Sequence, residues 1–411
     1  MPKPPRLFLG GAVALLVATL FASFAEVASA RVKLITLPVR ERVEIQLDNP
    51  DATLVEEERI VPLVKGENQV DFSWANTQVD PNTIVFRVIP HDERVAGKGP
   101  PDVKVLSVSY PPNEAALVWT VAASDSGSAR VRISYLLGNL TKSFNYRAIA
   151  SNDERTLDLS QYMRLQNFAN EEFGSTGVWA GFGPRFSKPL GINETKEMLV
   201  EKFRDVPIRK TYSCNPQEYD YLDRAQNKLR VPMHYVLTND QEHKLGAAAL
   251  PFGKVRIFIE GAGEHAAANT AFLGEDWGQF TPKDDEMRLY LGVAQDVVVK
   301  RTIDKNEARR ISGNLYDHEV IVKYEIENFK KQPVTLDLVE NVRHVHNEVR
   351  GDTGRDVAWE LGPEQTLGDE PDAERSTFEK LVFHVDLPAA SADGKAEKVV
   401  HKLHLIMKNE W

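Results

Sequence analysis

Apolar side chains recur at every second residue in short runs along most of the chain. In the run KVRIFIE, Val255, Ile257 and Ile259 alternate with charged or outward-facing residues, and EVIVKYEIE repeats the theme. A β-strand sends successive side chains to opposite faces, so each run has one face to bury and one to expose to water. Turn residues separate the runs, and helical periodicity is nearly absent. The pattern predicts an all-β protein built from antiparallel β-sandwich domains with little helix.

Breaks in this pattern predict three parts. Residues 1–30 read as a signal peptide, residues 31–123 as an N-terminal β-domain, and residues 124–411 as a second, larger β-sandwich domain. The predicted boundary is the turn-rich SDSGS, Ser124 to Ser128. Periodicity blurs between Ser187 and Arg230, where KEMLVEKF is compatible with a short helix.

The first thirty residues carry an export signal. Lys3 and Arg6 precede an apolar run from Leu7 to Phe24, and Ala28-Ser29-Ala30 supplies small residues for a peptidase. We expect cleavage after Ala30, with a retained membrane anchor as the alternative. No later segment is apolar enough to cross a bilayer, so the predicted location is periplasmic or secreted.

Composition narrows the classes of partner. The 411 residues include 50 Lys and Arg against 60 Asp and Glu, a net charge of −10, which disfavours nucleic acid as a partner. Cys214 is the only cysteine, so no disulfide can form within the chain. We expect it to be a buried or inert thiol. The oligomeric state stays open.

The stretch from Leu250 to Arg301 is the most informative. LPFGKVRIFIEG and MRLYLGVAQDVVVKR flank the acidic, turn-rich FLGEDWGQFTPKDDE, which predicts a pair of antiparallel strands joined by a long loop. We predict that the aromatic side chains of this loop, Phe272, Trp277 and Phe280, contact a protein or glycan partner. The alternative is that they pin the loop to the sandwich.

A glycine motif in the same loop matches the sequence fingerprint of a dinucleotide-binding site. Gly261-Ala262-Gly263-Glu264-His265-Ala266 follows a strand and has the G-x-G-x-x-A form. The preceding strand alternates charge with apolar residues, whereas the central parallel strand of a dinucleotide fold is continuously apolar. We therefore expect a hairpin loop here and no bound cofactor. The acidic residues nearby lack the spacing of a calcium loop.

Histidines offer the one metal hypothesis. His344 and His346 are two residues apart, so a strand would point both imidazoles to one face. Together with His384 or His404, these two histidines could hold a zinc or copper ion. The simpler interpretation is that they are surface histidines on a solvated strand.

The order of several motifs resembles a known family. The motifs are YLLGNLTKSFNYRA, LDLSQYMRLQNF, VLTND, LPFGKVRIF, FLGE and MRLYLGVAQDVVVKR. From about Ser124 onward the chain is similar to the C-terminal domain of unknown function of mucoidy inhibitor A-like proteins. It departs from many members in having no long helical hairpin before this domain. The resemblance implies a link to exopolysaccharide and no established catalytic residues.

Together these features predict an exported, non-catalytic β-sandwich protein that binds a protein or glycan partner in the cell envelope. The alternative is a hydrolase of envelope polymers with a metal or carboxylate site.

Overall fold

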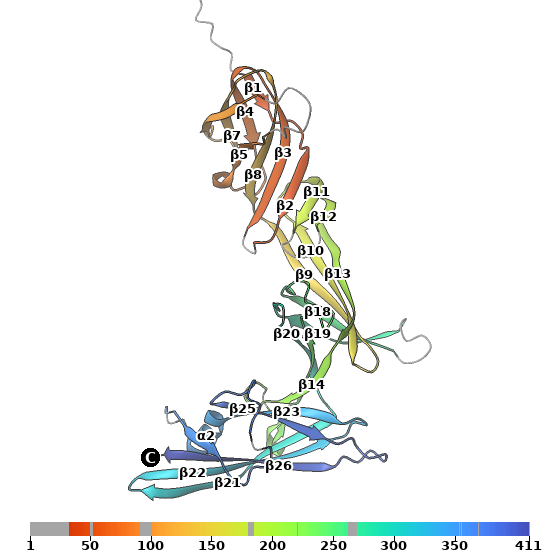
Figure 1. Cartoon of the computed structure of the whole chain (residues 1–411), viewed down its shortest axis with the longest axis vertical. Coiled ribbons are helices and arrows are strands. Elements are labelled where there is room, and N and C mark those ends of the chain that lie inside the picture. The colour runs from red at the N-terminus through yellow and green to blue at the C-terminus, as the bar shows by residue number, and fades with distance from the viewer. Residues whose placement is uncertain are drawn as a thin grey trace, which may run out of the picture. The chain divides into compact units, whose positions relative to one another are not determined.

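A computed structural model describes most of the chain after the predicted signal peptide, which lies outside the described residues. Strands dominate, so the predicted all-β class is confirmed (Figure 1). None of the described helices is long and apolar enough to span a membrane. The described ranges are 33–49, 52–90, 101–179, 185–219, 221–261, 269–352, 354, 356–368 and 370–410.

The chain divides into two compact units. Unit 1 contains the residues up to Leu140 together with Asn167–Trp179 and Arg185–Glu194, and unit 2 contains Thr141–Gln166 and the residues from Thr195 onward. Leu140, the first residue of β9 (Leu140–Ala150), and Asn167, the last residue of β10 (Thr156–Asn167), belong to unit 1, and the rest of both strands belongs to unit 2.

Unit 1 is built from two sheets. Its elements are β1 (Lys33–Thr36), β2 (Arg42–Gln46), β3 (Thr53–Leu63), β4 (Gly66–Ser73), the 3₁₀ turn η1 (Pro81–Thr83), β5 (Val85–Val88), β6 (Val103–Ser109), β7 (Ala116–Ala123), β8 (Gly127–Leu137), β11 (Phe173–Trp179) and β12 (Phe186–Leu190). The four-stranded sheet has the order β1-β4-β7-β6, and the six-stranded sheet has the order β12-β11-β2-β3-β8-β5. Phe72, Trp119 and Tyr135 form an aromatic cluster in the buried interior, with ring centroids 5.8 and 5.9 Å from Phe72.

The predicted domain boundary at Ser124 to Ser128 is wrong. These residues make the turn between β7 and β8, and β8 pairs antiparallel with β3 from Gly127↔Leu63 to Leu137↔Thr53. The segment after the turn therefore belongs to unit 1. A cluster of turn residues marks a chain reversal inside a domain as well as a boundary between domains, and local sequence does not distinguish the two.

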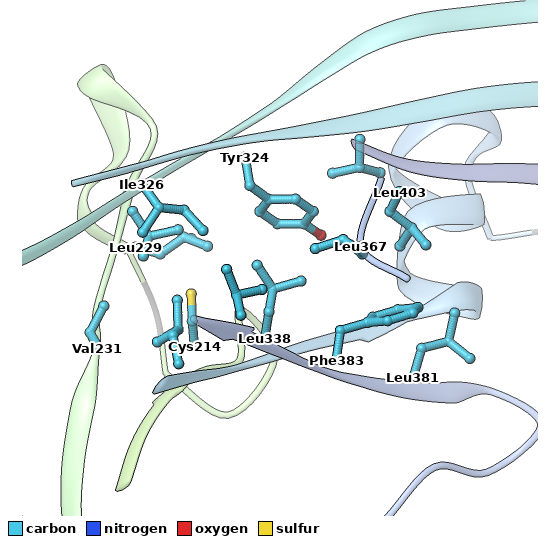
Figure 2. Close-up of a cluster of buried hydrophobic side chains, with 14 of the residues drawn as sticks. Cys214, Leu229, Val231, Tyr324, Ile326, Leu338, Leu367, Leu381, Phe383 and Leu403 are labelled. Atoms are coloured by element: carbon cyan, nitrogen blue, oxygen red, sulfur yellow. The ribbon is translucent and has the colours of Figure 1, made fainter. Parts of the chain in front are cut away.

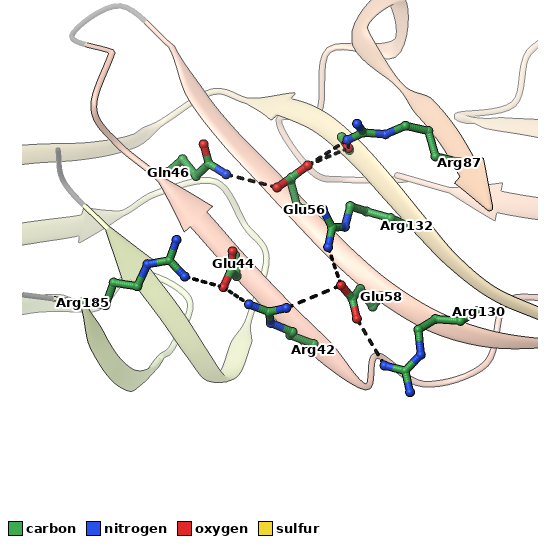
Figure 3. A network of polar contacts seen from close by, with 10 residues as sticks. Arg42, Glu44, Gln46, Glu56, Glu58, Arg87, Arg130, Arg132 and Arg185 are labelled. Carbon is green, nitrogen blue, oxygen red and sulfur yellow. Dashed lines mark hydrogen bonds and ion pairs between the residues drawn. The ribbon is translucent and has the colours of Figure 1, made fainter. Parts of the chain in front are cut away.

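The outer face of the six-stranded sheet is a network of ion pairs (Figure 3). Glu58 on β3 contacts Arg42, Arg130 and Arg132, with the Arg132 pair at 2.6 Å. Arg87 pairs with Glu56 and Arg185 with Glu44 on the same face. Each labelled arginine has a carboxylate partner, and the five arginines share three glutamates, Glu44, Glu56 and Glu58. Exposed pairs of this kind contribute about 0 to 1 kcal/mol each.

Unit 2 contains three further sheets. Its other elements are β13 (Thr195–Pro207), β14 (Arg209–Cys214), β15 (Tyr221–Asp223), the 3₁₀ turn η2 (Arg224–Gln226), β16 (Lys228–Leu229), β17 (Pro232–Thr238), β18 (Gly253–Glu260), β19 (Thr270–Gly278), β20 (Glu286–Val293), β21 (Val297–Ser312), β22 (Leu315–Asn328), β23 (Val334–Asn341), α2 (Val342–Arg350), β24 (Ala358–Leu361), β25 (Lys380–Leu387) and β26 (Lys398–Glu410). The strand orders are β13-β10-β9-β18-β19, β20-β17-β14-β23-β25 and β15-β16-β21-β22-β26-β24.

One local prediction fails in unit 2, and one detail of its sheets was not foreseen. KEMLVEKF forms part of β13, which pairs antiparallel with β10, so the suggested short helix is absent from this segment. The sheets are also mixed rather than purely antiparallel, because β18 runs parallel to β9 and β14 runs parallel to β23. Strand direction depends on which distant strands pair, and alternation within one strand carries no information about that choice.

The last two sheets of unit 2 pack as a sandwich. Tyr324, Ile326 and Leu403 from one sheet face Leu338 and Phe383 from the other (Figure 2), and all five side chains are buried. Cys214 lies in the same core, and burial raises the pKa of its thiol above the usual range. The thiol is therefore protonated and unreactive at neutral pH, as expected from its isolation in the sequence.

A buried ion network crosses this sandwich. Arg301 on β21 donates from Nε to Glu340 Oε2 on β23 at 2.7 Å, and its Nη1 lies 2.7 Å from Glu348 on α2. Tyr324 donates its hydroxyl to the same Glu340 oxygen at 2.5 Å. Arg301 and Glu340 are both essentially inaccessible to solvent. The pair therefore ties the two sheets together at a site where either charge alone would be costly.

We expect Arg301→Met to lower the free energy of unfolding of the sandwich by about 3 to 5 kcal/mol, because it leaves the Glu340 carboxylate buried without its cation. Hydrogen exchange of the β22 and β23 amides measures this quantity. Arg309→Met, at an exposed position of the same strand, is the control and should change it by less than about 0.5 kcal/mol. The double change with Glu340→Leu should cost less than Arg301→Met alone, and an equal or greater cost would contradict the interpretation.

Candidate binding surface

The predicted loop between Gly261 and Glu286 contains a strand. Residues Thr270–Gly278 form β19, which pairs antiparallel with β18, whereas β20 pairs with β17 in a different sheet. The predicted pairing of the two flanking strands is therefore wrong. The acidic residues of this segment suggested a loop, but Glu275 lies on the outer face of β19 opposite Arg256, where its charge is balanced.

An irregularity in β19 decides which side chains face outward. Ile257 pairs with Gly274 and Phe258 with Phe272, so Leu273 is an extra residue on β19. Without this bulge, alternation from Trp277 and Glu275 would place Leu273 on the outer face. The bulge shifts the alternation by one and places Phe272 there instead, where it is 60% exposed.

A stacked aromatic pair lies at one end of this face. The rings of Phe252, just before β18, and Trp277 on β19 are nearly parallel, with an interplanar angle of 2° and centroids 5.1 Å apart. Both side chains are about half exposed, at 51% and 49%. Lys254 Nζ lies 5.0 Å from the Trp277 ring centroid, within the range of a cation–π interaction. Trp277 therefore contacts both a ring and a cation.

A second aromatic contact lies at the other end of the face. Phe258 on β18 and Phe272 on β19 meet edge to face, with centroids 5.5 Å apart, and Arg147 on β9 lies 5.2 Å from the Phe258 ring centroid. We define the aromatic surface as the outward side chains of β18 and β19 with the two flanking positions that complete it: Arg147, Phe252, Lys254, Arg256, Phe258, Phe272, Glu275 and Trp277.

Charged side chains fill the space between these two aromatic contacts. Glu275 accepts from Lys254 Nζ at 2.7 Å and from Arg256 Nε at 3.2 Å. The hydrogen bond from Lys254, the Lys254 charge and then Arg256 hold the pKa of the Glu275 carboxyl below its usual value. The surface thus presents rings, cations and a carboxylate on one face of the sheet.

Asp276 links β19 to β20 by hydrogen bonds from its side chain. Its side chain accepts from the Tyr290 backbone N–H of β20 at 2.7 Å and from the Trp277 backbone N–H at 2.8 Å. One carboxylate therefore connects β19 to a strand of the neighbouring sheet. Glycine at position 278 allows close packing of β19 against Val255 and Met287, because a Cβ there would lie 3.0 Å from both Met287 Sδ and Val255 Cγ2.

The structure brings together two of the three predicted contact residues. Phe272 and Trp277 belong to the aromatic surface, and Phe280 lies beyond the end of β19, 55% exposed. Phe252, Lys254 and Phe258 were not predicted to take part in binding. Lys254 and Phe258 on β18, and Phe252 just before it, lie an even number of residues from Arg256, which was a usable signal because such residues face the same side of a strand.

His344 and His346 do not lie on a strand. They belong to α2, which begins after Asn341, whose side chain caps the His344 backbone N–H at 3.0 Å. Two residues on a helix are rotated by about 200°, so the imidazoles point to different sides. His346 is buried with Val342 and Val345, whereas His344 is partly exposed. The expectation that both share one face is wrong.

The other candidate ligands have separate partners. His384 Nδ1 and Nε2 each lie 2.8 Å from a carboxylate oxygen, of Asp337 and Asp372 respectively. His404 Nδ1 accepts the Glu364 backbone N–H at 3.0 Å. Within the described part of the chain, no group of three or more His, Cys, Asp or Glu side chains could hold a metal ion. The glycine motif lies almost wholly outside the described residues, at 262–268.

No protein-family model matches this sequence, and no curated protein is similar enough to it to serve as a relative. The resemblance to the mucoidy inhibitor A-like domain therefore stays a prediction.

We expect Lys254→Met to raise the pKa of the Glu275 carboxyl toward its usual value, because the largest stabilisation of the carboxylate is lost. In the native chain the pKa is depressed, so the stabilisation is present above the unfolded-state pKa and disappears as pH falls through the folded-state pKa. An NMR titration of the Glu275 carboxyl carbon measures both values. Lys283→Met, in the turn after β19, is the control. A native Glu275 that titrates at the usual value would contradict the pairing.

Proposed function

We propose that this protein is an exported, non-catalytic binding protein of the cell envelope, and that its aromatic surface binds a glycan. The observation that supports the proposal is the stacked, half-exposed pair of Phe252 and Trp277 on the outer face of a sheet. Exposed aromatic rings grouped on one face are typical of binding surfaces rather than of solvated sheet faces.

The chemistry of the surface suits a sugar. A pyranose ring has C–H groups on its faces and hydroxyl groups around its rim. The C–H groups pack against the electron-rich face of an aromatic ring such as Trp277. The hydroxyl groups can bond to Lys254, Glu275 and Arg256, which lie beside that ring and offer both donors and an acceptor.

Charge placement favours a glycan over a protein partner. The centres of protein–protein interfaces are depleted of charged residues. The centre of the aromatic surface is instead charged, because Lys254, Glu275 and Arg256 lie between the two aromatic contacts rather than around them. A protein surface packed here would have to desolvate these charges, whereas sugar hydroxyls can replace the water they lose.

The proposal of export is supported by the signal-type pattern of residues 1–30, in which Lys3 and Arg6 precede an apolar run and Ala28-Ser29-Ala30. The resemblance to mucoidy inhibitor A-like proteins also favours a role near exopolysaccharide.

The test is the retention of the mature chain on an array of neutral and acidic envelope glycans. We expect a subset of glycans to bind, and Trp277→Ala to weaken that binding at least about tenfold through loss of the stacking face. Tyr110→Ala, an equally exposed aromatic residue of unit 1, is the matched control and should bind as the native chain does. If no glycan is retained, or if Trp277→Ala binds unchanged, the proposal is wrong, and a protein partner becomes the better interpretation.

A further inference from the structure

A groove of about 690 Å³ adjoins the aromatic surface in unit 2. Trp277 lines it, so the same indole belongs to both features. The groove extends from β19 over β20 and β17 to the segment after β14, with Asp276, Tyr290, His234 and Tyr219 among its lining residues.

The floor of the groove is aromatic. The rings of Tyr219 and Tyr290 stack with centroids 6.4 Å apart and an interplanar angle of 15°. The His234 ring lies 5.6 Å from Tyr290, and His234 is only 9% exposed. Its Nδ1 is buried and has no hydrogen-bond partner among the described residues.

The charge of the groove differs from that of the chain. Its described lining contains four cations against two carboxylates, an excess of two positive charges in a protein whose net charge is −10. Arg375 is neutralised by Asp337 at 2.7 Å. Arg230, Arg288 and Lys380 are exposed and form no ion pair with any described residue.

These three cations contrast with the arginines of the ion network in unit 1. There, each labelled arginine has a carboxylate partner in the chain (Figure 3). In the groove, no carboxylate of a described residue forms an ion pair with Arg230, Arg288 or Lys380. Burial, and after it the charge of Arg288, lower the pKa of His234, so its ring stays neutral at neutral pH and offers a hydrogen bond rather than a further charge.

We propose that the groove binds the acidic groups of the glycan, so that the ligand is an anionic polysaccharide. This inference rests on the proposed function, because one sugar ring of the ligand stacks on Trp277. Neighbouring residues of the same polymer then extend over Tyr290 and Tyr219, and their carboxylate or sulfate groups pair with Arg230, Arg288 and Lys380.

Matched pairs of probes test the inference. We compare binding of oligogalacturonate with its uncharged methyl ester, and of dextran sulfate with dextran, by calorimetry on the mature chain. In at least one pair the acidic member should bind about tenfold or more tightly, and its advantage should fall when salt rises from about 50 mM to about 500 mM. Arg288→Gln should reduce the advantage about fivefold. Arg309→Gln, an exposed arginine far along β21, should leave it unchanged.

The outcomes separate the two proposals. If the array retains glycans in a Trp277-dependent way but neither acidic probe is preferred, the groove inference is overturned and the proposed function stands. If the array retains none, the proposed function itself fails. Poly-glutamate is the charge-matched probe without sugar rings. If it binds as tightly as the preferred acidic glycan, the anion preference is not directed at a glycan, and the groove inference is also overturned.

Discussion

The candidate site depends on one carboxylate. Asp276 accepts backbone N–H groups from Tyr290 and from Trp277, and so fixes β19 against a strand of another sheet. Because β19 lies at the edge of its own sheet, this contact determines how Trp277 is presented. The indole contacts Phe252 and Lys254 and also lines the cationic groove. The proposed stacking position and the proposed anion site are therefore parts of one surface.

The sandwich at the C-terminal end of unit 2 supports this arrangement in a different way. Its core combines apolar layers with the buried Arg301–Glu340 pair, while β14 and β23 of the same unit carry lining residues of the groove. The buried pair is satisfied only when Arg301 and Glu340 face each other, so it favours one alignment of the two sheets. Ligand-binding side chains on the outside of a rigid scaffold lose little conformational entropy when a ligand binds.

Much of the fold follows from the alternation of side chains. It predicted the strands and which side chains of β18 face outward, since Val255 and Ile257 are buried and Arg256 is exposed. It did not predict the partners of β18, because pairing depends on distant segments, nor Phe272 on the outer face, because a bulge at Leu273 shifts the alternation. Helix α2 had local signals that the strand interpretation overlooked: the cap Asn341, apolar residues three apart at Val342 and Val345, and Gly351 after the last turn.

The most direct test of the account is hydroxyl-radical footprinting of residues 31–411 with and without a saturating glycan retained on the array. The account predicts that Trp277, Phe252, Tyr219 and Tyr290 become protected together, because one ligand covers the aromatic surface and the groove. Tyr110 and Phe168, which are exposed in unit 1, should react equally in both samples. Protection of those two rings, with Trp277 still reactive in the complex, would contradict the central claim.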